Sequence, residues 1–182
     1  MRALVVYESM YGNTHAVATD IAAGLRAAHE VTLVPVSRAT RELVAGADLI
    51  VVGGPTHMHG ISSAKSRRTA AESARKEGSG LTLDPDAEGQ GLRAWLERLG
   101  ELQALAAAFD TRLSGAPVFT GRASRGISRR LARAGCRLLA APESFLISKR
   151  NTLLEGEAAR ARQWGTLVGE AAREALAADK RS

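Results

Sequence analysis

The chain alternates short apolar runs with longer segments whose apolar residues recur at helical spacing. The runs have the length and apolar content of buried strands, at residues 3–7, 31–36, 48–52, 105–109 and 137–147. Helical patterns separate or follow them, at residues 14–28, 40–45, 91–102, 122–134 and 155–177. Strands joined by helices are typical of parallel strands with crossover connections, so the sequence predicts an α/β fold built on a parallel sheet.

A single domain, residues 1–182, is expected, because 182 residues with 45% hydrophobic content suffice for one core. Residues 62–88 interrupt the alternation as a polar, glycine-punctuated insertion, which is predicted to form a solvated helix followed by a loop. Cys136 is the only cysteine, so no internal disulfide can form and a reducing cytoplasm is the expected location. No apolar run approaches the length that spans a bilayer, so no membrane association is expected.

The net charge of +6 is concentrated in one region. Residues 110–150 carry nine basic and two acidic side chains, whereas the rest of the chain is close to neutral. Four arginines of the predicted 122–134 helix share one face: Arg122, Arg125, Arg129 and Arg133. An acidic partner on this surface and a solvated face without a ligand are both open interpretations. Nucleic acid is not expected as a partner, because interleaved aromatic residues and a nucleic-acid-binding motif are missing.

The loop between the first strand and the first helix is crowded with glycine, hydroxyl and amide residues. The main-chain N–H groups at a helix start are free, and the helix dipole adds partial positive charge, so such a loop can hold a phosphate without a lysine. Ser9, Asn13 and Thr14 can donate further hydrogen bonds, and Gly12 permits close approach of the backbone. Capping of the helix by the same side chains is the alternative interpretation.

The spacing of this segment resembles the signature of the flavodoxin family. It reads Val5-Val6-Tyr7-x-Ser9-x-x-Gly12-x-Thr14-x-x-x-Ala18-x-x-Ile21. The resemblance extends over nearly the whole chain and implies a three-layer, doubly wound sheet of five parallel strands in the order 2-1-3-4-5. It also implies FMN as the cofactor, with the phosphate bound by the first loop: Ser9, Met10, Tyr11, Gly12, Asn13 and Thr14.

Two further segments follow the ends of predicted strands and are expected at the same edge of the sheet. The resemblance implies that one packs on a face of the isoalloxazine ring: Pro55, Thr56, His57, Met58, His59 and Gly60. It implies that the other meets the pyrimidine edge of the ring: Phe109, Asp110, Thr111 and Arg112. The two nearby histidines lack third and fourth ligands of suitable type, so no metal site is expected.

Several nucleotide-binding classes are disfavoured, because the chain has neither a G-x-G-x-x-G nor a G-x-x-x-x-G-K motif after its first strand. The resemblance implies an FMN-binding electron carrier that passes electrons between redox partners and needs no catalytic acid, base or nucleophile. The expected partner is an acidic redox protein facing the arginine surface. An FMN-dependent NAD(P)H:quinone or flavin reductase on the same fold is the alternative, and a flavin-free basic binding module is a third possibility.

Overall fold

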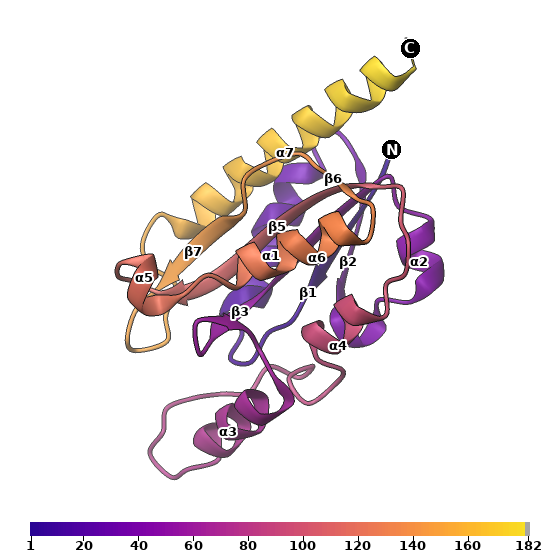
Figure 1. Ribbon diagram of the computed structural model, residues 1–182. Coiled ribbons are helices and arrows are strands. Elements are labelled where there is room, and N and C mark those ends of the chain that lie inside the picture. The colour runs from indigo at the N-terminus through magenta and orange to yellow at the C-terminus, as the bar shows by residue number, and fades with distance from the viewer. Residues whose placement is uncertain (181–182) are drawn as a thin grey trace.

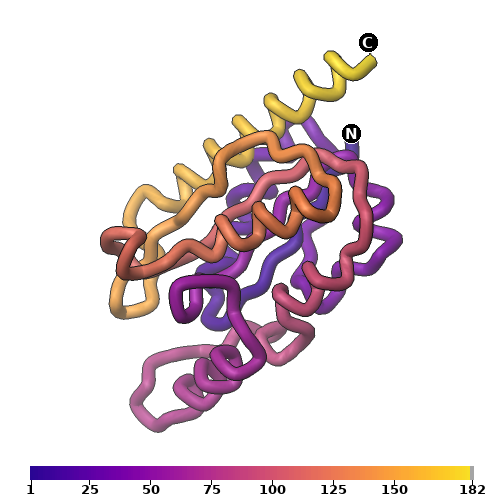
Figure 2. The backbone as a smooth tube through the Cα atoms, in the orientation of Figure 1, coloured from indigo at the N-terminus to yellow at the C-terminus, as the bar shows by residue number. Residues whose placement is uncertain are grey.

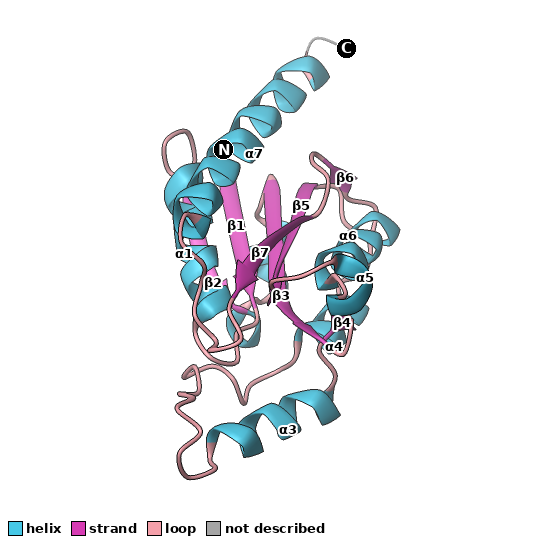
Figure 3. Ribbon diagram, turned by 90° about the vertical axis from the view of Figure 1, so that its left-hand side faces the viewer, coloured by secondary structure: helices cyan, strands magenta, loops and turns pink. Residues whose placement is uncertain are grey.

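The computed structural model describes residues 1–180, which form a parallel sheet with helices on both faces (Figures 1 and 3). Its main strands are β1 (Arg2–Tyr7), β2 (Glu30–Pro35), β3 (Leu49–His57), β5 (Leu105–Leu113), β6 (Arg137–Leu138) and β7 (Glu143–Ile147). They are ordered β2-β1-β3-β5, with β6 and β7 both paired to the outer side of β5. The short β4 (Gly60–Ile61) folds back antiparallel on β3. The predicted order 2-1-3-4-5 is therefore confirmed when β6 and β7 are counted as one strand.

Two groups of helices cover the two faces of the sheet (Figure 3). One face is covered by α1 (Asn13–Leu25) and α7 (Glu157–Asp179), and the other by α2 (Arg41–Ala45), α4 (Leu92–Glu97) and α6 (Ala123–Arg133). Neighbouring strand residues point to opposite faces, so Leu4 and Val5 enter different cores. None of the described helices combines the length and the apolar composition that crossing a bilayer requires.

The two central strands run further than the sequence predicted. β3 was expected to end near Val52 and β5 at Phe109, but they continue to His57 and Leu113. Their added residues pair with each other at Pro55 and Thr111, and β5 also gains β7 as a partner. The polar residues expected in two loops therefore lie on strands, which hold them more rigidly.

The fifth predicted strand, residues 137–147, is interrupted. Leu105 pairs with Arg137 but Phe109 pairs with Glu143, so the outer chain uses two more residues than β5 over the same length. Pro142 lies in the interruption and cannot donate a main-chain hydrogen bond to the sheet. The predicted 91–102 helix is also shorter, because α4 ends at Glu97.

A helix and a long loop lie beyond the carboxyl edge of the sheet (Figures 1 and 2). We call residues 62–91 the strap. It contains α3 (Ala64–Ala74), which begins with a capping box formed by Ser63 and Ser66, and then an irregular return to α4. Arg67 joins the two halves, because Nη2 donates to the carbonyls of Ala87 at 2.8 Å and Gly89 at 2.5 Å. The predicted solvated helix followed by a loop is confirmed.

Two short helices complete the chain. The 3₁₀ helix η1 (Val36–Arg38) follows β2, and α5 (Pro117–Thr120) lies between β5 and α6. β2 is an edge strand and ends at Pro35, which cannot donate a main-chain hydrogen bond to a further strand.

Candidate functional site

A hollow of about 220 Å³ opens at the carboxyl edge of the sheet. All three predicted segments contribute to its lining, with Met10, Tyr11, Asn13, Thr14, Pro55, Thr56, His57, Thr111 and Arg112. Three residues that the sequence analysis missed complete the wall: Leu113, Ile147 and Asn151. The carboxyl ends of neighbouring parallel strands meet at one edge, which explains why segments so distant in sequence come together.

One end of the hollow, here called the phosphate end, is formed by the start of α1. Gly12 precedes the helix in the left-handed region, with φ of 87°, and a Cβ added there would meet nothing within 4 Å. No side chain caps α1. Within residues 1–180, the main-chain N–H groups of Asn13, Thr14 and His15 have no hydrogen-bond acceptor. The capping interpretation therefore fails, and three donors remain for an anion.

Side chains at the phosphate end are held in place by hydrogen bonds. The Ser9 hydroxyl accepts from the Gly12 N–H at 3.1 Å, so it shapes the loop from inside. The hydroxyls of Thr14 and Thr111 lie 2.7 Å apart in a buried pair. Only one of their two hydrogens is used between them, which leaves the other for a ligand.

Two residues of the first loop are tied to distant parts of the chain. The Asn13 side-chain amide donates to the carbonyl and the side-chain oxygen of Asn151, both at 3.0 Å. The Tyr11 hydroxyl donates to the Ala70 carbonyl of the strap at 2.8 Å, and burial raises the pKa of Tyr11. Nothing in the sequence indicated that Asn151 belongs to the site, because it is 138 residues away from its partner Asn13.

The opposite end of the hollow, here called the ring end, begins with the last residues of β3. The Thr56 hydroxyl accepts from the Ala123 N–H at 2.9 Å, which ties β3 to the start of α6. Met58 and His59 form the tip of the turn into β4 with positive φ angles of 46° and 72°. Of the predicted residues of this segment, Met58, His59 and Gly60 lie outside the hollow.

Phe109 and Asp110 do not line the hollow either. The Phe109 ring is buried in the core and meets the Phe145 and Trp164 rings edge to face, with centroids 6.3 Å away in each case. The Asp110 carboxylate is fully buried and accepts from the Ser124 N–H at 2.6 Å, and burial raises the pKa of Asp110. The Asp110 side chain, which the resemblance places with its segment at the pyrimidine edge of the ring, therefore lies outside the lining of the hollow.

Arg112 organises the chain that follows β5. Nη1 donates to the carbonyls of Leu113 at 3.2 Å and Gly115 at 2.8 Å, and to the Thr120 hydroxyl at 2.9 Å. The resemblance places Arg112 at the pyrimidine edge of the ring, and the residue lines the hollow. Its guanidinium holds the loop between β5 and α5.

Arg122 was predicted on the exposed face of a helix, and this is wrong. It precedes α6, where its guanidinium donates to the Ser144 hydroxyl at 3.0 Å and to the Pro142 carbonyl at 2.7 Å. The other three arginines of the predicted face are exposed on α6: Arg125, Arg129 and Arg133.

Apolar side chains near the ring end are unusually exposed. Val118 and Phe119 on α5 are 77% and 78% accessible, Met58 is 87% accessible, and Leu113 is 48% accessible. A backbone bridge between His59 and Gly121 brings the Met58 turn next to the chain that follows α5. Exposed apolar side chains grouped on one surface are typical of binding sites.

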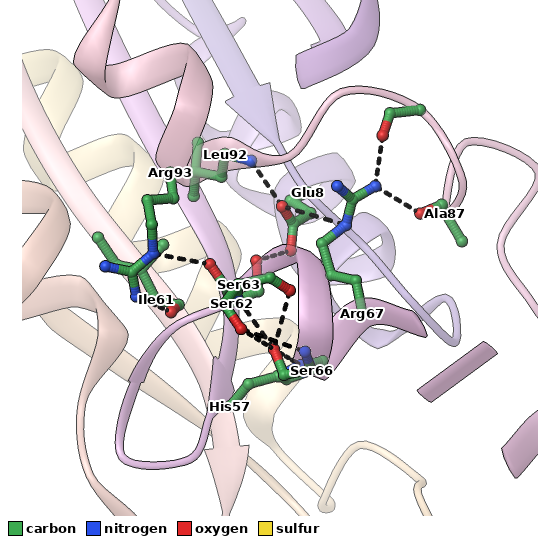
Figure 4. A network of polar contacts seen from close by, with 11 residues as sticks. Glu8, His57, Ile61, Ser62, Ser63, Ser66, Arg67, Ala87, Leu92 and Arg93 are labelled. Atoms are coloured by element: carbon green, nitrogen blue, oxygen red, sulfur yellow. Dashed lines mark hydrogen bonds and ion pairs between the residues drawn. The ribbon is translucent and has the colours of Figure 1, made fainter. Parts of the chain in front are cut away.

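A buried carboxylate joins the first loop to both ends of the strap (Figure 4). Glu8 is 3% accessible; it accepts from the Leu92 N–H at 2.6 Å and from the Ser62 hydroxyl, and Arg67 Nε lies 3.8 Å away. The strap also reaches the loop through Asp84, whose N–H donates to the Met10 carbonyl at 2.8 Å. The negative charge of Glu8 is thus satisfied away from the anion site.

The family is decided by a model of the flavodoxin family, which matches residues 5–139, more than half of the chain. The chain belongs to the flavodoxin family. No curated protein was found to match this flavodoxin-family chain in sequence.

Solved structures share the fold of this flavodoxin-family chain. A flavodoxin from the domain Archaea has a TM-score of 0.65 and 17% identity, over 95% of this chain and 99% of that one. A WrbA-like protein from Agrobacterium tumefaciens has a TM-score of 0.59 and 21% identity, over 95% and 98%. The flavodiiron protein from Giardia intestinalis has a TM-score of 0.62 and 18% identity, over 95% of this chain and 36% of that one.

Flavodoxin family proteins bind FMN as their cofactor. The phosphate end of this hollow fits the phosphate of FMN, because its unbonded N–H groups and its hydroxyl pair can donate to a dianion. Gly12 has no side chain, so a ligand can approach the backbone closely there. Across residues 1–180, no group of three or more His, Cys, Asp or Glu side chains is placed to hold a metal ion.

Proposed function

We propose that the chain is an FMN-dependent electron-transfer protein that carries electrons between redox partners. The observation that carries the proposal is the uncapped start of α1, which opens into a hollow lined by all three segments of the family site. When bound, FMN supplies the redox chemistry, and the polypeptide supplies binding, orientation and shielding from water.

In this proposal the residues of the hollow bind different parts of FMN. The N–H groups at the start of α1 and the Thr14–Thr111 hydroxyl pair bind the phosphate. Pro55, Thr56 and His57 form one wall for the ring. Leu113 belongs to the wall that Arg112 holds in place. No side chain is required as a nucleophile.

The partner we propose is an acidic redox protein, because exposed arginines lie along α6. Arg125 is nearest the hollow among the exposed arginines of α6, because this helix begins at Ala123, whose N–H donates to Thr56 of the hollow wall. Arg133 lies eight residues further along the helix, about 12 Å away at 1.5 Å per residue. We place the protein in the cytoplasm, consistent with its single cysteine, which is free.

An FMN-dependent reductase is the second candidate, favoured by the exposed apolar side chains at the ring end. A substrate stacked beside the ring would cover Leu113, Val118 and Phe119. Steady-state oxidation of NAD(P)H with a quinone acceptor separates this activity from that of a carrier, which turns over only with a protein partner.

An absorbance titration of the purified protein with FMN tests the proposal. Binding should perturb the visible flavin spectrum and saturate at one FMN per chain. An electron donor protein should then reduce the bound FMN stepwise. A protein that neither purifies yellow nor binds FMN would overturn the proposed function.

A further inference from the structure

One histidine, His57, lines the hollow. The other ionisable side chains of its lining are Tyr11 and Arg112, and histidine is the residue type whose ordinary pKa lies closest to neutrality. His57 is fixed on β3, which makes it a rigid part of the wall. A histidine in this place can change its charge when the charge in the hollow changes.

The strap sets which nitrogen of His57 carries the proton. His57 Nδ1 lies 3.2 Å from the Ser66 hydroxyl of α3. The single hydroxyl hydrogen of Ser66 is directed to the Ser63 carbonyl at 3.1 Å, and the same oxygen accepts from the Ser63 N–H at 2.9 Å. With the hydrogen of Ser66 donated to the Ser63 carbonyl, its oxygen can accept from Nδ1–H of His57, which favours the neutral tautomer that carries no proton on Nε2.

The remaining ring nitrogen is available to a ligand. Within residues 1–180, His57 Nε2 makes no hydrogen bond, and it is not among the buried polar atoms that lack a partner. With Nδ1 turned to α3 and the residue lining the hollow, Nε2 is the polar atom that His57 offers to the site.

Two charged groups act on His57 from the elements packed around it. Glu8 at the end of β1 favours the charged ring, whereas Arg67 of α3 disfavours it. Burial is the largest effect, and it lowers the pKa of His57 below its ordinary value. The ring is therefore uncharged at neutral pH, with a basic Nε2.

We propose that His57 is the proton-binding residue of the FMN pocket and that Ser66 is its positioning residue. The inference rests on the proposed function. When a reduced redox partner delivers an electron to the loaded protein, the added negative charge favours uptake of one proton from water at Nε2. The only bond that forms in the polypeptide is Nε2–H, and it breaks when the electron leaves. By linkage, the midpoint potential depends on pH through this ring.

The positioning by Ser66 is tested on the full chain without FMN, by ¹⁵N NMR of the histidine rings. Wild-type His57 should be protonated at Nδ1 in its neutral form. Ser66→Ala should move a large fraction of the ring to the Nε2–H form, while His59, outside the hollow, stays unchanged. An identical His57 tautomer in Ser66→Ala would overturn the role of Ser66.

The proton uptake is tested on the FMN-loaded protein by titrating the ring before and after chemical reduction. The pKa of His57 should rise by about one unit on reduction, which is a tenfold gain in proton affinity. In His57→Asn, the part of the pH dependence of the midpoint potential that comes from proton uptake by His57 should disappear. In His59→Asn, that part should remain. If His57→Asn fails to fold, the wild-type titration decides alone.

A His57 titration that is the same in both redox states would overturn the inference and leave FMN binding intact. Failure of FMN to bind would overturn the proposed function and the inference together. The absorbance titration distinguishes these two results.

Discussion

The two ends of the hollow are built in different ways. At the phosphate end, one short stretch, residues 9–15, supplies the turn, the free N–H groups and the hydroxyl of Ser9 that shapes them. At the ring end, each wall is held from elsewhere: Thr56 by Ala123, and His57 by Ser66. The main-chain donors of the phosphate end are thus local in sequence, although Thr111 and Asn151 approach them from elsewhere in the chain, whereas both walls of the ring end depend on long-range contacts.

The strap connects the two ends. It contacts the phosphate end through Ala70 and Asp84, and the ring end through Ser66. His15 at the start of α1 adds a contact, with Nδ1 3.3 Å from the Asp84 carboxylate. Glu8 holds the strap where it leaves and rejoins the fold, so a change there should affect both ends at once.

The largest expected effect comes from Glu8→Ala. It leaves the Leu92 N–H, the Ser62 hydroxyl and Arg67 without their carboxylate, and losing one partner of a buried pair costs about 3 kcal/mol of unfolding free energy. Urea denaturation should show this loss, with faster hydrogen exchange in the strap. Glu88→Ala, which breaks only an exposed pair with Arg75, should cost less than about 1 kcal/mol. Equal costs for the two variants would contradict the role of Glu8 in holding the strap.

Arg112→Ala should affect the ring end alone. The loop carbonyls and the Thr120 hydroxyl lose their shared donor, which should cost about 2 kcal/mol of stability. Because the phosphate end is untouched, the affinities for FMN and for riboflavin, which lacks the phosphate, should fall by the same factor. Arg129→Ala on exposed α6 is the control. A loss confined to FMN would show that Arg112 serves the phosphate instead.

Gly12→Ala should affect the phosphate end alone. Alanine at a φ of 87° costs about 1–2 kcal/mol, so the turn and its N–H groups should shift. FMN affinity should fall about tenfold, the equivalent of about 1.4 kcal/mol, while riboflavin affinity stays unchanged. Gly78→Ala, at a φ of 73° in the strap with open space around it, should cost similar stability without changing FMN affinity. Equal loss of FMN and riboflavin binding would remove the distinction between the two ends.

The smallest expected effect is on association with an acidic partner. Arg125→Glu, near the hollow, should slow reduction by an acidic ferredoxin several-fold at low salt, and Arg133→Glu should slow it less. Both effects should fade near 1 M salt, where the screening length is about 3 Å. Stopped-flow rates over a salt series would measure this, and equal effects of the two variants would argue against docking beside the ring end.

The alternation of strand and helix patterns was enough to predict the α/β fold and the position of the strap, whereas the strand order was implied by the resemblance to the flavodoxin family. The first loop was also predictable, because its function depends on neighbouring residues: Gly12 adopts a backbone angle that glycine favours, and the helix start supplies the donors. A sequence pattern of this kind can be recognised because all the residues that it depends on lie within a few positions of one another.

Tertiary structure alone decided how the ring end is built and how Glu8 holds the strap. Pairing between β3 and β5 carried Asp110 and Arg112 onto a strand, which buried one beneath the hollow and turned the other into the support of a loop. Asn151 reaches the site from the chain that follows β7, and Glu8 has its partners in the strap and at the start of α4. The partners of Asp110, Glu8 and Asn151 are 14, 84 and 138 residues away along the chain, and a buried polar group pairs with the partner that packing brings to it.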